Sequence, residues 1–205
     1  AIHTKPAECT VYQNIYQHNQ AHPHDLALEY FGVKITFSKL FAQVESCAKA
    51  LLHAGVHLGD RVTLCTSGTP EAVYVVLACS KIGAVANFIN PMFQPEQIRD
   101  RINETEASLL FVLDKLHPNI TSILSETCIQ QVIVLPATNS LPAPMRFLAS
   151  LKEAPDAALN HELKSNASYC LWTKFIQSGT QYTAPTEVSY QKDLPVAMES
   201  SSGTT

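Results

Sequence analysis

The feature that most constrains the fold is a regular alternation of short apolar runs with helical segments in the middle of the chain. The predicted strands are "RVTLC" (61–65), "AVANF" (84–88), "SLLFVL" (108–113) and "QVIVL" (131–135). The predicted helices between them cover Glu71–Ile82, Pro95–Asn103 and His117–Thr127. Such an alternation implies βαβ crossovers. The sequence therefore predicts an α/β fold whose mostly parallel sheet is flanked by helices.

A helix, a hairpin and a second, longer helix are predicted ahead of this unit. The stretch "TVYQNIYQHNQ" from residue 10 places apolar and aromatic side chains at helical spacing. The stretch "LALEYFGVKITF" predicts two short strands joined by a turn at Gly32. Ser38 is the predicted N-cap of the long helix, whose apolar residues repeat at helical spacing until Gly55.

The character of the chain changes between residues 136 and 195. Six prolines interrupt this range, and polar residues dominate stretches such as "NHELKSNAS". The sequence predicts a long proline-broken connection within the domain, with one or two short helices such as "LWTKFIQSG". The stretch "LPVAM" (194–198) then predicts a further strand.

The motif Ser-Gly-Thr occurs three times, and each copy has its own predicted role. In "TSGTP" (66–70), Thr69 or Ser67 precedes a proline, which is typical of a helix N-cap. In "QSGTQ" (177–181), the glycine follows a short helix, which is typical of a C-cap. Only "SSGTT" (201–205) follows a predicted buried strand. Because backbone N–H groups of such a loop can converge on an anion, this copy is the predicted phosphate loop.

Composition and charge exclude several classes of protein. A formal net charge of -4 and 14 Lys and Arg spread along the chain provide no basic field for nucleic acid. No apolar window approaches the roughly 20 residues that a membrane-spanning helix needs, and the N-terminus lacks the apolar core of a signal peptide. The six cysteines form no C-x-x-C pair, which favours reduced core thiols in a cytoplasmic protein.

The histidines do not predict a metal site. The stretch "HPH" (22–24) comes nearest, but Pro23 splays its neighbours and no carboxylate or cysteine cluster completes a shell, so a solvated loop is favoured. His53 and His57 flank a glycine turn without a predicted carboxylate partner and are also expected to be solvated. The sequence thus predicts neither a metal ligand nor a catalytic residue in this chain.

Three longer motifs occur in order along the chain. The first is "ITFSKLFAQVESCAKALLHAGVHLGDRVTL" (35–64), the second is "SKIGAVANFINP" (80–91), and the third is "VAMESSSGTT" (196–205). They resemble, respectively, the long-helix entry with its Gly-Asp-Arg-Val turn, the helix and strand ending in Asn-Pro, and the opening of the nucleotide loop of the AMP-forming acyl-CoA synthetases. These enzymes belong to the adenylate-forming superfamily, with luciferases and the adenylation domains of peptide synthetases.

This resemblance implies a fold, a site and a reaction. Residues 1–205 would be an incomplete AMP-binding domain, the N-terminal part of the large domain, with the C-terminal domain absent. Ser201, Ser202, Gly203, Thr204 and Thr205 match loop residues that bind nucleotide phosphates in the family. The family uses ATP and Mg²⁺ to form an acyl-adenylate, and then CoA to form a thioester. The stretch from "FINPMFQPEQ" to "DKLHPNI" (88–120) resembles the fatty-acyl branch, so a fatty acid is the expected substrate.

The resemblance leaves two alternatives open. The family's loop continues as Gly-x-Pro-Lys after the position of Thr205, so the 205 residues are predicted to be a fragment that is inactive alone. One alternative is an adenylation domain of a peptide or polyketide assembly line, which passes its adenylate to a carrier protein. The other is a truncated, non-catalytic binding module.

Overall fold

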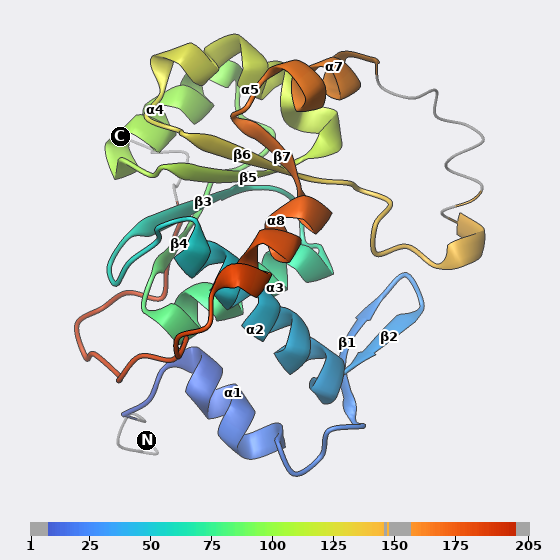
Figure 1. The fold of residues 1–205 in the computed structure, drawn as a ribbon, viewed down its shortest axis with the longest axis vertical. Helices are drawn as coiled ribbons and strands as arrows, with labels where there is room; N and C mark the ends of the chain where they lie inside the picture. The colour runs from blue at the N-terminus through green and yellow to red at the C-terminus, as the bar shows by residue number, and fades with distance from the viewer. Residues whose placement is uncertain (1–7, 146, 148–156, 200–205) are drawn as a thin grey trace, which may run out of the picture.

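The structure, a computed structural model, describes residues 8–145, 147 and 157–199 of the chain. In these residues a six-stranded sheet lies between two groups of helices (Figure 1). Every pair of neighbouring strands in this sheet runs parallel. The predicted α/β fold class is confirmed.

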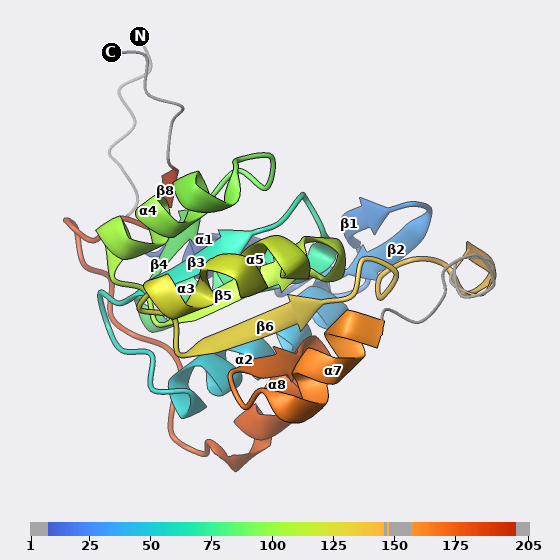
Figure 2. The same cartoon turned by 90° about the horizontal axis from the view of Figure 1, so that it is seen from above.

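The strands and helices follow the predicted alternation closely. The sheet has the spatial order β7 (Tyr169–Leu171), β6 (Gln131–Leu135), β5 (Leu109–Leu113), β3 (Arg61–Cys65), β4 (Val85–Phe88), β8 (Ala197–Glu199). One face carries α2 (Phe37–His53), α3 (Pro70–Ile82) and α8 (Trp172–Ser178), with α1 (Val11–Asn19) packed on α3. The other face carries α4 (Pro95–Thr105), α5 (His117–Ile123) and α7 (Ala157–Ser165) (Figure 2). The part of the chain that the structure describes also contains the short 3-10 turns η1 (Asp114–Leu116), η2 (Leu124–Glu126) and η3 (Gly179–Gln181).

The central strands are buried on both faces, because successive side chains of a strand point to opposite sides. On β5, Leu109 and Phe111 belong to the core under α2, α3 and α8, whereas Leu110 and Val112 belong to the core under α4, α5 and α7. The ring of Phe111 packs edge to face against Phe175 of α8, with 5.3 Å between ring centroids. This two-sided burial explains why the strands are continuous apolar runs in the sequence.

The predicted hairpin is present, but the predicted start of the long helix is wrong by two residues. β1 (Leu26–Tyr30) and β2 (Val33–Thr36) pair antiparallel around a turn in which Phe31 and Gly32 have φ of 47° and 80°. The N-cap of α2 is Thr36, not Ser38, because the Lys39 N–H donates to Thr36 Oγ1 at 3.4 Å. Thr36 thus ends the hairpin and starts the helix.

The range 136–195 is more than the predicted connection. It contains α7 and α8, and between them β7, which pairs parallel with β6 at one edge of the sheet. The prediction missed β7 because a strand of three residues is too short to show periodicity. Among the described residues, no helix combines the length and apolarity needed to cross a bilayer.

The strand predicted from "LPVAM" is present, but it is not buried. β8 pairs with β4 at the other edge of the sheet, and all three of its residues are exposed. The expectation of a buried strand fails because β8 is an edge strand, with a neighbour on one side only among the described residues.

Candidate nucleotide site at the carboxyl edge of the sheet

The loops that follow the parallel strands all leave from one edge of the sheet, the edge formed by the strands' carboxyl ends. From β3 the chain passes to α3 on one face, whereas from β5 it passes to α5 on the opposite face. Strand order therefore reverses between β3 and β5, and ligands of open α/β sheets bind outside the carboxyl ends at such a point. This edge is the candidate site.

β8, the strand that precedes the predicted phosphate loop in the sequence, ends at the same edge. The loop residues, Ser201, Ser202, Gly203, Thr204 and Thr205, lie outside the described residues. The structure does describe β8, which leads toward them. β8 pairs with β4 so that Glu199 lies opposite Phe88. The Ala86 N–H donates to Val196 O at 3.0 Å. The last described residue of the strand, Glu199, is thus level with the carboxyl end of β4.

The first Ser-Gly-Thr copy, "TSGTP", is a helix cap, as predicted. Thr69 is the N-cap of α3, and its Oγ1 accepts a hydrogen bond from the Ala72 N–H at 3.3 Å. Pro70 takes the first helical position, where its missing N–H removes no hydrogen bond. The Thr69 hydroxyl therefore serves as the N-cap of α3.

The second copy, "QSGTQ", also ends a helix, but not for the reason that a glycine C-cap suggests. Gly179 is the C-cap of α8, yet its φ of -63° and ψ of -16° are ordinary helical values that any residue adopts. A Cβ placed on Gly179 would lie 2.5 Å from the backbone N of Ala50 in α2. The glycine is needed because α8 and α2 approach each other closely here.

A cluster of polar side chains that the sequence analysis missed lies at the carboxyl end of β6. Glu71, in the first turn of α3, is 4% exposed. Its Oε1 accepts hydrogen bonds from Asn139 Nδ2 at 2.8 Å and from Ser140 Oγ at 2.6 Å. These contacts join residues 68 and 69 positions apart, so no local spacing could have revealed them.

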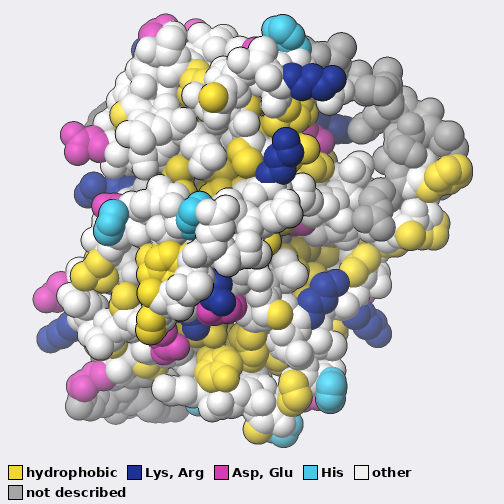
Figure 3. Space-filling view, in the orientation of Figure 1, with side chains coloured by type: hydrophobic (Ala, Val, Ile, Leu, Met, Phe, Trp, Pro, Cys, Tyr) yellow, Lys and Arg dark blue, Asp and Glu magenta, His cyan; other side chains and the backbone are white. Residues whose placement is uncertain are grey.

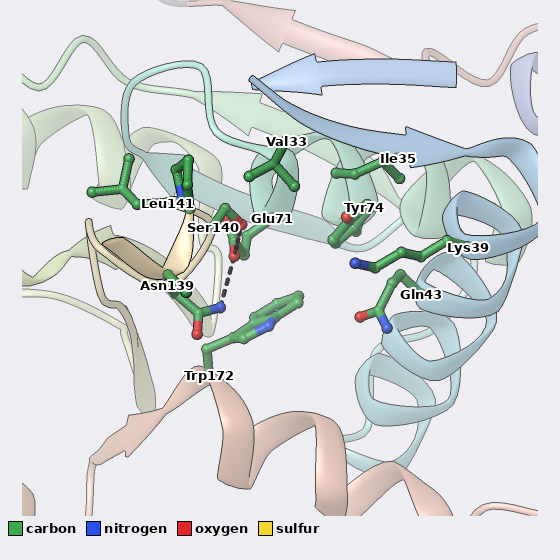
Figure 4. Close-up of a pocket in the computed structure, with 12 residues that line it drawn as sticks. Val33, Ile35, Lys39, Gln43, Glu71, Tyr74, Asn139, Ser140, Leu141 and Trp172 are labelled. Atoms are coloured by element: carbon green, nitrogen blue, oxygen red, sulfur yellow. Dashed lines mark hydrogen bonds between the residues drawn. The ribbon is translucent and has the colours of Figure 1, made fainter. Parts of the chain in front are cut away.

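This cluster forms one wall of a cavity of about 390 Å³. Figure 4 shows Glu71, Asn139 and Ser140 on one side of the cavity, Trp172 below it, and Lys39 reaching in from α2. The other lining residues are Val33, Ile35, Gln43, Tyr74, Leu141, Pro142 and Ala143.

The cavity and β8 lie at different parts of the carboxyl edge. Asn139 and Trp172 follow β6 and β7, whereas the loop follows β8 at the opposite edge. With a spacing of about 4.8 Å between neighbouring strands, β6 and β8 are roughly 19 Å apart. The cavity therefore lies far from β8, the strand that leads to the predicted phosphate loop.

The histidines and cysteines show ordinary structural roles. The expectation that His57 lacks a carboxylate partner is wrong, because its Nδ1 lies 3.5 Å from Asp60 Oδ2; its side chain is nevertheless 81% exposed, as predicted for a solvated residue. Within the described ranges, no group of His, Cys, Asp and Glu side chains has the geometry of a metal site. Burial raises the pKa of the Cys65 and Cys79 thiols to about 12, so neither is a thiolate nucleophile at neutral pH. Cys128, in contrast to the predicted core thiols, is exposed.

Charged side chains do not gather by sign on the surface seen in Figure 3. Lys and Arg side chains are scattered over this face, between acidic and neutral residues. Electrostatic steering of a polyanion requires a continuous basic patch, which this face does not present.

Comparison with known proteins decides the family. The model of the AMP-binding enzyme family matches residues 15–205, a range that includes the predicted phosphate loop. The chain belongs to the AMP-binding enzymes.

Relatives of this AMP-binding chain are named acetyl-coenzyme A synthetases. The protein from Pseudoalteromonas atlantica is 34% identical over 138 residues, which cover 62% of this chain and 20% of the relative. The protein from Sinorhizobium medicae is 36% identical over 110 residues, which cover 51% of this chain and 17% of the relative. The matched residues thus span a fifth or less of these relatives.

Solved structures of larger ligases share the fold. The anthranilate CoA ligase AuaEII in complex with anthranoyl-AMP superposes with a TM-score of 0.76 at 20% identity, covering 98% of this chain and 34% of that one. A long-chain-fatty-acid-CoA ligase from Archaeoglobus fulgidus superposes with a TM-score of 0.72 at 16% identity, covering 98% of this chain and 36% of that one. At these identities the likeness establishes the fold alone.

Proposed function

We propose that the 205 residues are the N-terminal portion of the AMP-binding domain of an ATP-dependent carboxylate–CoA ligase. The observation that carries this proposal is the position of β8, which runs along β4 to the carboxyl edge of the sheet and continues into "SSGTT". The family match over residues 15–205 and the ligase names of the relatives support it. Under this proposal a second domain and the rest of the nucleotide site follow Thr205.

The proposed reaction has two half-reactions. A carboxylate oxygen attacks the α-phosphorus of ATP, the bond to pyrophosphate breaks, and an acyl-adenylate forms. The CoA thiol then attacks the acyl carbon, AMP leaves, and the thiol proton passes to solvent. A carboxylate is a weak nucleophile toward a highly charged phosphate, so positioning and charge neutralisation supply most of the catalysis.

The phosphate loop would contribute hydrogen bonds to this positioning. Ser201, Ser202, Thr204 and Thr205 would donate hydroxyl hydrogen bonds to phosphate oxygens. Gly203 would allow the backbone to approach the phosphates, because it has no Cβ. Mg²⁺ would enter bound to the triphosphate and neutralise part of its charge.

The identity of the carboxylic acid substrate is a second, more specific part of the proposal. The resemblance to the fatty-acyl branch predicts a fatty acid, whereas the first curated relatives are named for acetyl-coenzyme A. The first alternative, an assembly-line adenylation domain, is not favoured by these names. The free thiols support the proposed cytoplasmic location, because reduced cysteines are typical of that compartment.

The test is ATP–pyrophosphate exchange by a protein that continues past Thr205, measured with acetate, medium-chain and long-chain fatty acids in turn. Acid-dependent exchange, followed by thioester formation when CoA is added, is expected. The 205-residue chain alone should show none above a no-protein control. Exchange that depends on an amino acid, or thioester formation on a carrier protein but not on CoA, would contradict the proposal.

A further inference from the structure

Lys81 is a buried cation that joins three parts of the fold. It lies in the last turn of α3 and is 6% exposed. Its Nζ lies 3.5 Å from Glu45 Oε2 on α2, 3.5 Å from Glu187 Oε2, and 4.1 Å from the ring centroid of Tyr12 on α1. A buried charge is tolerated only when it is paired, so the buried position of the Lys81 ammonium group depends on these contacts.

Residues 182–196, here called the strap, connect η3 to β8 without a helix or strand of their own. Among the hydrogen bonds that hold the strap against the helices, three involve Lys81 or a carboxylate paired with it, and a further one runs from Gln13 Nε2 to Val188 O at 3.4 Å. Thr186 Oγ1 donates to Glu45 Oε2 at 2.9 Å, Gln13 Nε2 donates to Glu187 Oε1 at 2.9 Å, and the Val188 N–H donates to the Lys81 carbonyl at 3.1 Å. Each of these three contacts involves Lys81 itself or one of the two carboxylates paired with it.

The strap then passes directly to β8. Val188 Cγ2 would lie 3.0 Å from a Cβ on Gly83, the left-handed residue that ends α3, so the strap packs on the turn into β4. Beyond it, Val196 O accepts the hydrogen bond from Ala86 N that starts the pairing of β8 with β4. β8 has only three residues, all exposed, and so has little apolar burial to fix its own position.

The electrostatics keep Lys81 charged at neutral pH. Burial is the largest single influence and lowers the pKa of Lys81, but Tyr12, Glu45 and Glu187 together outweigh it, so the pKa is raised. The ion pairs therefore persist under ordinary conditions.

We propose that Lys81 is a positioning residue: through Glu45 and Glu187 it fixes the strap, and through the strap it sets where β8 lies, the strand that leads to the predicted phosphate loop. The consequence for ATP rests on the proposed function. The placement of the strap and β8 by Lys81 does not, and it can be tested on the 205-residue chain.

Hydrogen–deuterium exchange on that chain tests the placement. In Lys81→Met, which keeps an apolar stem of similar length, amide hydrogens of residues 186–199 are expected to exchange about tenfold faster, while those of β5 and β6 are unchanged. Lys81→Arg should restore slow exchange, because it keeps the charge. The matched control is Arg99→Met, which removes a cation paired with Asp100 and Glu126 on the surface of α4 and should leave residues 186–199 unchanged.

A second variant keeps the test decisive if Lys81→Met fails to fold. Thr186→Val removes only the hydroxyl that bonds Glu45, and it should speed exchange in the strap and β8 by a smaller factor than Lys81→Met. Wild-type exchange at residues 186–199 in both variants would overturn the proposal. So would faster exchange spread evenly over the whole sheet, since that is global destabilisation.

The role toward ATP needs a protein that continues past Thr205. There, Lys81→Met should raise KM for ATP in adenylate formation about tenfold, while the reaction of supplied acyl-adenylate with CoA keeps its rate. If neither wild-type half-reaction occurs, the proposed function fails, and the exchange result on the strap stands by itself. An active Lys81→Met protein with unchanged KM for ATP but faster exchange would overturn the link from β8 to the phosphate loop.

Discussion

Asn139 donates a hydrogen bond from Nδ2 to the buried Glu71 carboxylate at 2.8 Å, and so ties the segment after β6 to the first turn of α3. Asp114, at the end of β5, holds the same segment from the other side, because the Ala137 N–H donates to its Oδ2 at 3.1 Å. Two acidic residues, Glu71 in the first turn of α3 and Asp114 directly after β5, therefore hold the segment between residues 136 and 140. A loop at the carboxyl edge of an open sheet is usually mobile, and this one is anchored twice.

Glu71→Ala should destabilise the chain by about 2 kcal/mol, because it leaves the Asn139 and Ser140 donors without their charged acceptor. Glu71→Gln keeps an acceptor oxygen and should cost about 1 kcal/mol. Urea unfolding followed by circular dichroism measures both. Glu96 is the matched control, since it follows Pro95 in the first turn of α4 as Glu71 follows Pro70, but is exposed. A loss for Glu96→Ala as large as that for Glu71→Ala would show that only the helix dipole matters.

Gly179→Ala should destabilise the chain by about 2 kcal/mol or more, because its methyl group would meet the Ala50 backbone in α2 and force the two helices apart. Gly68→Ala, in the look-alike loop "TSGTP", has no atom within 4 Å of the added Cβ and should change stability by less than about 0.5 kcal/mol. The midpoint of thermal unfolding compares the two variants. Equal midpoints would mean that α8 can move away from α2 without loss.

Alkaline pH should unfold the chain through its buried thiols. In the folded chain the pKa of Cys65 and of Cys79 is raised to about 12 by burial, and that of Cys47 is raised well above its ordinary value of 9.0. In the unfolded chain these thiols ionise near their ordinary pKa, so between about pH 9 and pH 12 the folded state binds more protons. The contribution of these thiols to the free energy of unfolding is therefore fully present below about pH 9. Above that pH it falls by about 1.4 kcal/mol per pH unit for each thiol.

Urea unfolding at several pH values between about 8 and 11 measures this slope. Cys65→Ala removes one of the three thiols and should reduce the slope, whatever its effect on stability at neutral pH. Cys128→Ala removes an exposed thiol and should leave the slope unchanged. A slope that is the same in all three proteins would assign the alkaline transition to other groups.

The sequence predicted the sheet well because its signal is local. Central strands such as β5 are buried on both faces and are therefore continuous apolar runs. The ends of α3 are likewise marked by local residues, Thr69 and Pro70 at its start and Gly83 at its end. β7, at one edge of the sheet, carries no such signal. β7 has three residues, and its place beside β6 depends on packing of Trp172 and Phe175 against Phe111, more than 50 positions earlier in the chain.

Sequence analysis finds candidate site residues only where a motif is contiguous, and the predicted phosphate loop stays a prediction. "SSGTT" could be recognised, but the Glu71 cluster and the Lys81 cluster could not, because each joins side chains far apart in sequence. Glu45 and Thr186, for example, are separated by 141 positions. Only the packing of elements distant in the chain, such as α2 against the strap, brings such residues together.

The last prediction separates the phosphate loop from its look-alike and needs a protein that continues past Thr205. There, Thr204→Ala or Thr205→Ala should mainly slow adenylate formation, because each lost hydroxyl removes a bond to a charged phosphate worth roughly 1.5 to 3 kcal/mol, or about 10- to 150-fold in rate. The thioester step should change less. Thr69→Ala should instead cost about 1 kcal/mol of stability by removing the cap of α3, with pyrophosphate release nearly intact. If the folded Thr69→Ala protein loses adenylation while Thr204→Ala and Thr205→Ala keep it, the cradle is the loop after β3, at the point where strand order reverses, and the assignment of "SSGTT" is wrong.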